Sequence, residues 1–461
     1  MSSAGISFGG LASGLDTKAI ISALVAIEQR PITALETKKT SLGKQKSLFG
    51  DLKGLLEKLT TAAKAIQGTT NFLSYKAASD DENVLTASAS NSAVPGTYTV
   101  RVLDLAKAQV NSSSGSASPT ASLGVSGELQ LDVGGVGHPI SVANPTLESI
   151  AAAINAENDT LGFGVRAEVV DTGNLASGGA NRYQLVVRST TTGSTGGFSL
   201  TATEGDPAFA NLIDDVNTNV RTIGSDARIE LNGGITVYRS SNSIGDVIPG
   251  VTIDLKSVPV PPKDITITVG TDTEATSKKV TEFVDAYNKV VDFFATQNAL
   301  DADGKAKGPL FGDVTLRSIR SNVRSIVGGS VAGTGNQAYQ LFAQIGITSD
   351  RDGKLTFNQS KFEEALADDE HAVAAVFTDP TGGIAGRLVT QLDLYTDSVD
   401  GLIKTRSDGY DRQVKQTQDR IDQSQRRLEA YQKQLEAKYA NLESLLSKLQ
   451  SQGSSLSSFG K

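Results

Sequence analysis

The side chains that most often carry out catalysis are scarce in this chain. None of its 461 residues is Cys, and His138 and His371 are its two histidines. Neither lies near a plausible serine or metal partner in the sequence, and a zinc site needs several such ligands. His138 stands beside a Gly-Pro turn, at the start of the strand-like stretch HPISVA, and His371 stands at an acidic helix start. We therefore expect both histidines at the surface and no zinc site.

Two short runs rich in Asp resemble fragments of a calcium loop. They are DADGK at 301–305 and DRDGK at 350–354. An EF-hand loop places Asp at positions 1, 3 and 5, Gly at position 6 and Glu at position 12. Here each Gly comes at position 4 and the closing Glu is missing. Because Asp-Gly is a preferred turn sequence, both runs predict tight turns rather than metal sites.

The glycines of FGGLASGLD, residues 8–16, resemble a phosphate-binding loop only loosely. A P-loop follows a buried strand and ends in Gly-Lys-Ser or Gly-Lys-Thr. No strand pattern precedes Gly9, and the carboxylate of Asp16 would repel a phosphate at the helix start. No catalytic constellation remains, so we expect a protein that is not an enzyme and that uses no cofactor or metal.

Both ends of the chain show the pattern of long helices. Apolar residues recur at intervals of seven from Asp16 to Gln67 and again from about 410 to 450, as in a seam that needs a partner helix. Pro31 should break the first run into one short and one longer helix, because proline lacks the amide N–H. The predicted seam comprises Leu35, Leu42, Phe49, Leu52, Leu56 and Leu59 near the N-terminus, and Val414, Ile421, Leu428, Leu435, Leu442 and Leu449 near the C-terminus.

This seam has two interpretations. It could be an ordinary coiled coil that closes one domain. Alternatively, the two ends could pair with each other and then with neighbouring subunits.

The middle of the chain has a different texture. Residues 73–120 and 223–270 alternate like strands, residues 127–200 read as a β-β-α-β-β block, and helices return from 273. The fold class is therefore α+β and multidomain, with a long helical, coiled-coil leg and nested β-rich domains. The predicted domains are a flexible helical terminal domain (1–40 with 440–461), a helical leg (41–72 with 273–439), a β-rich domain (73–120 with 223–272) and an inserted β-rich outer domain (121–222).

Charge and hydropathy exclude several classes of protein. Residues 1–68 and 401–461 each carry a net charge of +4, which leaves −16 for residues 69–400. An acidic middle argues against nucleic acid as a ligand. Residues 1–17 lack the Lys or Arg of a signal peptide, and no apolar run reaches the roughly 18–20 residues of a membrane helix. We therefore expect no membrane insertion.

Several long motifs resemble the hook-associated protein 2 family, the bacterial flagellar filament cap proteins. The first is GLASGLDTKAIISALVAIEQRPITALETKKTSL at 10–42, followed by ARIELNGGITVYRSSNSIGDVIPGVTIDL at 227–255 and GIAGRLVTQLDLYTDSVDGLIKTRSDGYDRQVKQTQDRI at 383–421. Residues 127–197 are similar to an insertion repeat of flagellins and hook-associated proteins. The N-terminal family motif maps to Gly10, Leu11, Ser13, Gly14, Leu15, Asp16 and Pro31.

The resemblance implies a structural role in assembly. It implies a homo-oligomeric ring, in the pentamer to hexamer range, that caps the growing filament tip and promotes the folding and insertion of exported flagellin. The implied partners besides flagellin are hook–filament junction proteins, a cytosolic export chaperone on the C-terminal helix and, in some bacteria, host mucin. The implied location is extracellular, after export by the flagellar type III route.

Two alternatives remain at this point. The chain could be an extracellular adhesin whose β-rich domains bind host mucin or glycans. It could also be another axial protein of the flagellum, such as a hook–filament junction protein. For the cap interpretation, we expect residues 1–35 and 440–461 to be mobile in the free monomer and to become ordered on assembly.

Overall fold

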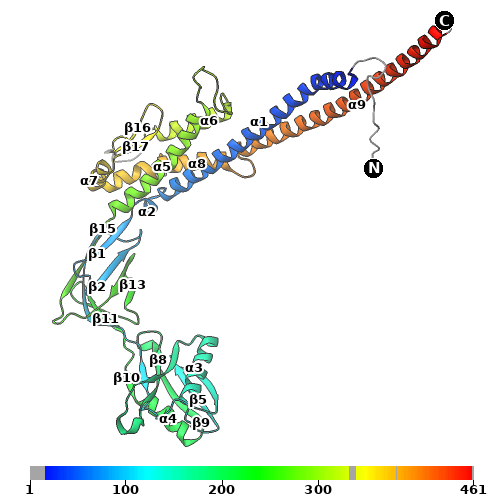
Figure 1. Cartoon of the computed structure of the whole chain (residues 1–461). Coiled ribbons are helices and arrows are strands. Elements are labelled where there is room, and N and C mark those ends of the chain that lie inside the picture. The colour runs from blue at the N-terminus through cyan, green and yellow to red at the C-terminus, as the bar shows by residue number, and fades with distance from the viewer. Residues whose placement is uncertain (1–15, 332–338, 381, 459–461) are drawn as a thin grey trace. The chain divides into compact units, whose positions relative to one another are not determined.

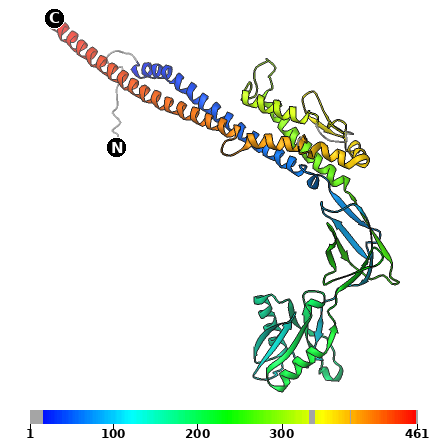
Figure 2. The same cartoon turned by 180° about the vertical axis from the view of Figure 1, so that it is seen from behind.

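The computed structural model describes residues 16–331, 339–380 and 382–458 (Figures 1 and 2). The chain divides into two compact units. One, the helical unit, comprises residues 1–72 and 274–461, and the other, the β unit, comprises residues 73–273. The β unit thus interrupts the sequence of the helical unit, which is the nested arrangement that the sequence predicts.

The helical unit is dominated by two long helices from opposite ends of the chain. Helix α1 spans Thr17–Ala65 and helix α9 spans Leu402–Ser458, and they lie side by side in both views (Figures 1 and 2). The other elements of this unit are α2 (Thr69–Phe72), α5 (Thr273–Gln297), α6 (Val314–Val327), β16 (Ile347–Ser349), β17 (Leu355–Phe357), α7 (Gln359–Thr378) and α8 (Ile384–Thr396).

Helix α1 runs through Pro31 without a break, so the predicted division into a short and a longer helix is wrong. Pro31 removes one backbone hydrogen bond and crowds the carbonyl group of Ile27, which costs roughly 3 kcal/mol in a helix interior. The next residue, Ile32, is only 1% exposed, while Pro31 itself is exposed to solvent. Burial of Ile32 and the pairing of α1 with α9 offset the local cost of the proline.

Helix α9 begins earlier and ends later than the predicted range of 410–450. Its start follows a turn in which the Asp397 carboxylate accepts hydrogen bonds from the backbone N–H groups of Val399 and Asp400. This turn separates α8 from α9. Helix α8 in turn packs against α1, α6 and α7, which places it at the centre of the helical unit.

An aromatic cluster forms the core at the base of the helical unit. The rings of Phe72 and Phe377 stack with centroids 4.7 Å apart, and Phe342 lies 5.1 Å from Phe377. Phe283 of α5 meets Phe342 at 6.1 Å in an edge-on arrangement. These distances are typical of favourable aromatic pairs, so the core ties α2, α5, α7 and the 341–345 segment together.

The first part of the β unit is a frame of two sheets around one apolar core. Their strand orders are β1-β15-β3-β11-β12 and β13-β14-β2. As the sequence predicts, 227–241 forms a hairpin, and Asn232 and Gly233 supply its turn with φ of 48° and 75°. The strands are β1 (Tyr75–Ser79), β2 (Leu85–Ala89), β3 (Gly96–Asp104), β11 (Ala227–Leu231), β12 (Ile235–Arg239), β13 (Ser243–Ile248), β14 (Val251–Leu255) and β15 (Asp264–Thr271).

The second part of the β unit is an inserted block with its own apolar core. Its sheets have the orders β6-β5-β9 and β10-β4-β8-β7. The predicted β-β-α-β-β order is confirmed. It is followed by strand β9 and helix α4, which were not predicted from the sequence. The elements are β4 (Val110–Ser112), β5 (Ser126–Val133), β6 (Val136–Ala143), α3 (Leu147–Leu161), β7 (Val165–Asp171), β8 (Tyr183–Ser189), β9 (Phe198–Gly205), α4 (Pro207–Thr218) and β10 (Val220–Thr222).

Strand pairing places the start of the inserted block near Val110. Strand β4 pairs with β8 and with β10, so residues 110–112 belong to the block's sheet and not to the frame. This start precedes the predicted residue 121. We propose that the chain has the four predicted domains, with the inserted domain beginning near Val110.

Candidate assembly surface

The histidines are placed far from any catalytic arrangement. His138 lies in β6 opposite Leu131, within the second strand of the predicted block, and it is half-buried rather than at the surface as expected. Because β6 is an edge strand, the sheet tolerates Pro139 beside it. The His138 ring packs 4.6 Å from Phe163, and His371 is exposed after a kink at Asp369. In the described part of the chain, no three His, Asp or Glu side chains are grouped so as to hold a metal.

Both Asp-Gly runs form tight turns, as the sequence predicts. The Asp301 carboxylate accepts hydrogen bonds from the backbone N–H of Asp303 and Lys305, at 3.0 and 2.8 Å. In the hairpin between β16 and β17, Asp350 accepts from the N–H of Lys354 at 2.8 Å. These carboxylates therefore stabilise their own turns.

The geometry of the α1–α9 pair is that of an antiparallel seam. Near the start of α9, the rings of Phe49 and Tyr410 lie 5.8 Å apart. Beside them, Lys46 Nζ lies 2.6 Å from an Asp411 carboxylate oxygen. Further along, Lys39 donates a hydrogen bond to Gln418, so α1 numbering falls as α9 numbering rises. The two ends of the chain thus form one paired arm.

The predicted seam residues fall into three groups. Seven are buried, five of them on α1 and two on α9. Three are half-buried, and two near the C-terminal end of α9 are exposed. The buried ones are Leu42, Phe49, Leu52, Leu56, Leu59, Ile421 and Leu435; the half-buried ones are Leu35, Val414 and Leu428; the exposed ones are Leu442 (43%) and Leu449 (54%). Near Phe49 and the start of α9, the seam residues are therefore buried within one chain. Towards the C-terminus, Leu442 and Leu449 of the same seam are exposed to solvent.

Ile32 was missing from the predicted seam, although its side chain is buried. Its spacing of three from Leu35 is a helical signal that could have identified it. Within the N-terminal family motif, Asp16 accepts a hydrogen bond from Ala19 N–H at 2.9 Å and caps α1. The other motif positions Gly10, Leu11, Ser13, Gly14 and Leu15 lie outside the described residues.

A polar cluster fixes the base of the arm to α6. Arg406 of α9 lies 2.6 Å from the nearly buried carboxylate of Asp313, and that carboxylate also accepts from Thr315 and Leu316 N–H at the start of α6. The hydroxyl of Tyr410 lies within hydrogen-bond distance of both Arg406 and Asp313. Burial raises the pKa of Tyr410. The hydroxyl thus stays protonated and available as a donor at neutral pH.

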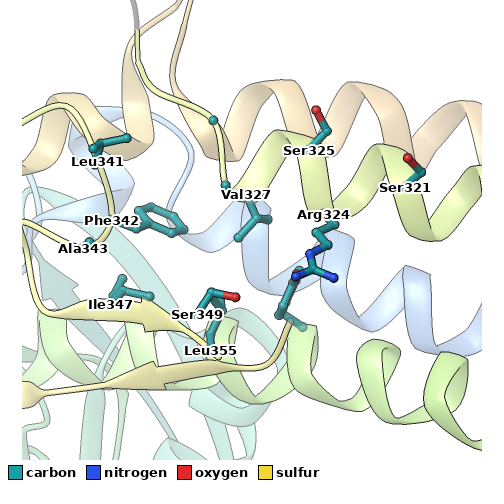
Figure 3. A pocket seen from close by; sticks show the side chains of 13 residues that line it. Ser321, Arg324, Ser325, Val327, Leu341, Phe342, Ala343, Ile347, Ser349 and Leu355 are labelled. Atoms are coloured by element: carbon teal, nitrogen blue, oxygen red, sulfur yellow. The ribbon is translucent and has the colours of Figure 1, made fainter. Parts of the chain in front are cut away.

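A groove of about 710 Å³ lies between α5, α6 and the β16–β17 hairpin (Figure 3). Its floor is largely apolar, with Val327, Phe342 and Leu355, and Tyr287 lines it as well. Burial raises the pKa of Tyr287. Figure 3 shows Arg324 of α6 at the edge of the groove, on the side facing the hairpin, where it donates to the carbonyl of Arg351. Among its described lining residues, Ser321, Ser325 and Ser349 have no His, Asp or Glu beside them in the lining.

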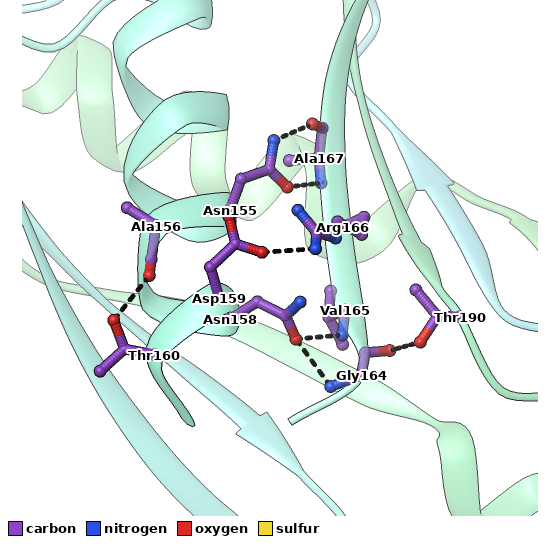
Figure 4. A network of polar contacts seen from close by, with 10 residues as sticks. All are labelled: Asn155, Ala156, Asn158, Asp159, Thr160, Gly164, Val165, Arg166, Ala167 and Thr190. Atoms are coloured by element: carbon purple, nitrogen blue, oxygen red, sulfur yellow. Dashed lines mark hydrogen bonds and ion pairs between the residues drawn. The ribbon is translucent and has the colours of Figure 1, made fainter. Parts of the chain in front are cut away.

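In the inserted block, α3 closes the open edge of strand β7 with its side chains (Figure 4). The Asn155 amide donates to Ala167 C=O at 2.7 Å and accepts from Ala167 N–H at 3.0 Å. The Asn158 carbonyl accepts from the N–H of Gly164 and Val165. Because these contacts use the backbone groups that a further strand would need, they block strand addition at this edge.

Among the described residues, no helix has both the length and the apolar character needed to cross a membrane.

Comparisons with known proteins connect this arrangement to one family. Residues 13–109 match the family model "Flagellar hook-associated protein 2 N-terminus", and residues 224–451 match "Flagellar hook-associated protein 2 C-terminus". The B-type flagellar hook-associated protein 2 of Pseudomonas aeruginosa is 31% identical over 426 residues, covering 88% of this chain and 86% of that protein. The flagellar hook-associated protein 2 of Escherichia coli K12 is 28% identical over 443 residues, covering 90% of each.

A solved structure shows the same architecture. The D1-D2-D3 domains of the flagellar cap protein FliD from Escherichia coli match with a TM-score of 0.66 and 27% sequence identity, covering 79% of this chain and 99% of that one. The predicted α+β, multidomain fold with a long C-terminal helix is confirmed.

Proposed function

The chain belongs to the flagellar hook-associated protein 2 family, and on that premise we propose that it caps the growing tip of a bacterial flagellar filament. The observation that carries the proposal is the match to the Escherichia coli flagellar cap protein over 79% of this chain. The role is structural. In the described part of the chain we find surfaces suited to binding and no group of residues arranged for catalysis.

We infer further that copies of the chain form a ring, in the pentamer to hexamer range, through the helical arm. A capping protein has to hold its position and still admit new subunits, so its contacts need to be numerous and individually weak. The exposed Leu442 and Leu449 fit that need, because each adds modest apolar area to a contact with a neighbour. Ser424 and Lys438 at neighbouring seam positions keep the stripe narrow.

In this proposal the ring promotes the folding and insertion of exported flagellin and contacts hook–filament junction proteins at the start of assembly. The protein acts outside the cell, at the filament tip, after export by the flagellar type III route. A cytosolic chaperone covers the C-terminal helix before export, which suits a helix whose last apolar positions are exposed. No observation on the chain favours the adhesin interpretation, so mucin binding is not part of the proposal.

The test is deletion of the gene in the organism that carries it. The deletion strain should swim poorly, lack filaments and release flagellin monomers into the medium, and a plasmid copy should restore all three. In a comparison strain, the plasmid copy encodes the chain truncated after residue 401, which lacks α9 and should not restore the filaments. Intact filaments in the deletion strain would contradict the capping role.

A further inference from the structure

The arginines of helix α6 gather on one face, and none of them forms an ion pair with an Asp or Glu among the described residues. Arg317, Arg320 and Arg324 follow one another at spacings of three and four, which places them on one side of the helix. The helix itself contains no Asp or Glu. Within the described part of the chain, none of the three forms an ion pair, although other Lys and Arg residues of the helical unit do.

This basic face borders the groove between α6 and the β16–β17 hairpin. Arg317 and Arg324 are exposed, and Arg324 lines the groove (Figure 3). Across the groove from Arg324, Leu341 is 41% exposed, while Val327, Phe342, Ile347 and Leu355 of the lining are buried. The surface therefore combines positive charge with accessible apolar area, which suits an acidic protein surface better than a small ligand.

The first half of helix α7 carries the opposite charge. Its sequence from 363 to 370 is EEALADDE, in which Glu364 and Asp368 are exposed while Glu363, Asp369 and Glu370 are half-buried. In the described part of the chain, Glu363, Glu364 and Asp368 form no ion pair with Lys or Arg. Their intrachain partners are neutral: Asp368 accepts a hydrogen bond from the Tyr339 hydroxyl at 3.0 Å, and Glu363 accepts one from the Gln359 amide at 2.7 Å. The neighbouring Lys361 is directed to the carbonyl of Ala343 instead.

Helix α8 packs against both charged helices. One copy thus presents a basic face on α6, with Arg317, Arg320 and Arg324, and an acidic face on α7, with Glu363, Glu364 and Asp368. Among the described residues, none of these six side chains forms an ion pair. Two copies that met through the same face would repel each other. Contact of unlike faces is heterologous, and it generates a closed ring when the rotation between copies closes.

We propose that the α6 basic face of one copy binds the acidic first half of α7 of the next copy, and that this contact sets the order of copies around the ring. The inference rests on the proposed ring and adds its contact surfaces. It predicts self-association that weakens as salt rises, because exposed charges are screened within about 8 Å at physiological ionic strength.

The experiment is a charge-reversal rescue on the full-length chain. The α6 variant is Arg317→Glu with Arg324→Glu, and the α7 variant is Glu364→Lys with Asp368→Lys. Each is expected to raise the dissociation constant for self-association at least tenfold, measured by sedimentation velocity at low and at high salt. An equimolar mixture of the two variants is expected to associate, because each supplies the face that the other then fits.

A matched control reverses two exposed charges elsewhere, Lys76→Glu with Lys107→Glu in the β unit. It is expected to leave the dissociation constant within threefold of the wild type. Arg317→Gln with Arg324→Gln separates lost attraction from added repulsion and should weaken association less than the reversal does. Circular dichroism melts confirm that every variant is folded.

The outcomes distinguish the two levels of inference. If the wild type associates and the α6 and α7 reversals do not weaken it, or if their mixture fails to associate, the contact proposed here is wrong while the capping role stands. If the wild type remains monomeric at every concentration and salt, both the ring and this contact fail.

Discussion

The aromatic ring of Phe49 in α1 lies 5.8 Å from that of Tyr410 in α9, with an angle of 37° between the ring planes. This pair joins the N-terminal and C-terminal helices at the base of the arm, where Tyr410 also meets Arg406 and Asp313. It therefore fixes both the register of α1 against α9 and the attachment of the arm to α6.

Replacing Phe49 with Ala should strongly destabilise the helical unit. The side chain is fully buried, and truncations of this kind typically cost about 3–5 kcal/mol. Urea unfolding followed by circular dichroism measures the change. Leu445→Ala is the matched control, because its side chain is 59% exposed and should cost less than about 0.5 kcal/mol. Equal losses for the two variants would contradict the packing described here.

Replacing Leu435 and Leu449 with Asp should have different effects on the monomer. Leu435 is 8% exposed, so an unpaired carboxylate there should loosen the α1–α9 pair and speed protease cleavage of α9. Leu449 is 54% exposed, so the same change should leave the cleavage rate of the monomer unaltered and weaken only self-association. Limited proteolysis and sedimentation read the two effects separately. A Leu449→Asp chain that associates like the wild type would remove the C-terminal leucines from the contact.

Replacing Pro31 with Ala should stabilise helix α1. The substitution restores one backbone hydrogen bond and removes a steric clash, for a gain of up to about 3 kcal/mol. Because Pro31 is exposed, the change should disturb no packing. Hydrogen exchange of the amides at 20–30 should slow. Faster exchange in that segment would show that the proline supports the helix in a way that its backbone geometry does not explain.

Asn155 should be essential to the edge of strand β7. Replacing it with Asp keeps the shape but places an anionic oxygen against the Ala167 carbonyl, which should cost about 1–3 kcal/mol. Thermal unfolding of the variant measures the loss. The nearby Thr160→Val serves as control, since that exposed hydroxyl bonds only to the carbonyl of Ala156 in its own helix. An unchanged midpoint for Asn155→Asp would mean that the edge does not need this cover.

The carboxyl group of Asp171 should titrate well below its usual range. Hydrogen bonds from the Arg182 guanidinium, at 2.8 and 2.9 Å, and then from Gly173 N–H, lower its pKa from 3.8 to about 2. A lowered native pKa gives a contribution to stability that is full above pH 3.8 and is lost as pH falls towards 2. Carboxyl chemical shifts follow the titration. In Arg182→Gln the midpoint should move back towards 3.8, and a native midpoint already near 3.8 would disprove the pairing.

Periodicity was the most reliable guide to the fold. Leu42, Phe49, Ile421 and Leu435 are buried where a heptad pattern predicts a seam, because such a pattern has physical meaning only with a partner helix. The Asn232–Gly233 turn was equally predictable, since its positive φ angles favour those two residue types.

Local rules failed where distant contacts outweigh them. Pro31 should have ended a helix, yet the helix continues because Ile32 is buried and α9 lies alongside. His138 was expected at the surface, but it is half-buried in β6 with its ring against Phe163, and Pro139 beside it is tolerated because β6 forms an edge of its sheet. The residues next to Pro31 do not reveal that a partner helix lies alongside, and those next to Pro139 do not reveal that its strand is at an edge.

The candidate surfaces were still harder to predict. The Arg face of α6 is visible as a spacing in the sequence. That these arginines form no ion pair among the described residues depends on where the fold places the carboxylates, which the spacing does not show. The Asn155 contacts join a helix to a strand that follows it, and amide side chains at such positions carry no periodic signal.

Strands β4 and β10 are hydrogen-bonded neighbours, and they carry the chain into and out of the inserted block. The two junctions therefore lie beside each other on the frame. Because β1, β3, β11 and β15 pair within the frame's own sheet, we expect insertions or deletions between the two junctions to leave that pairing unchanged. In genetic terms the block is a cassette with fixed borders, which can be exchanged in one recombination event and can diverge quickly without altering the helices that assemble.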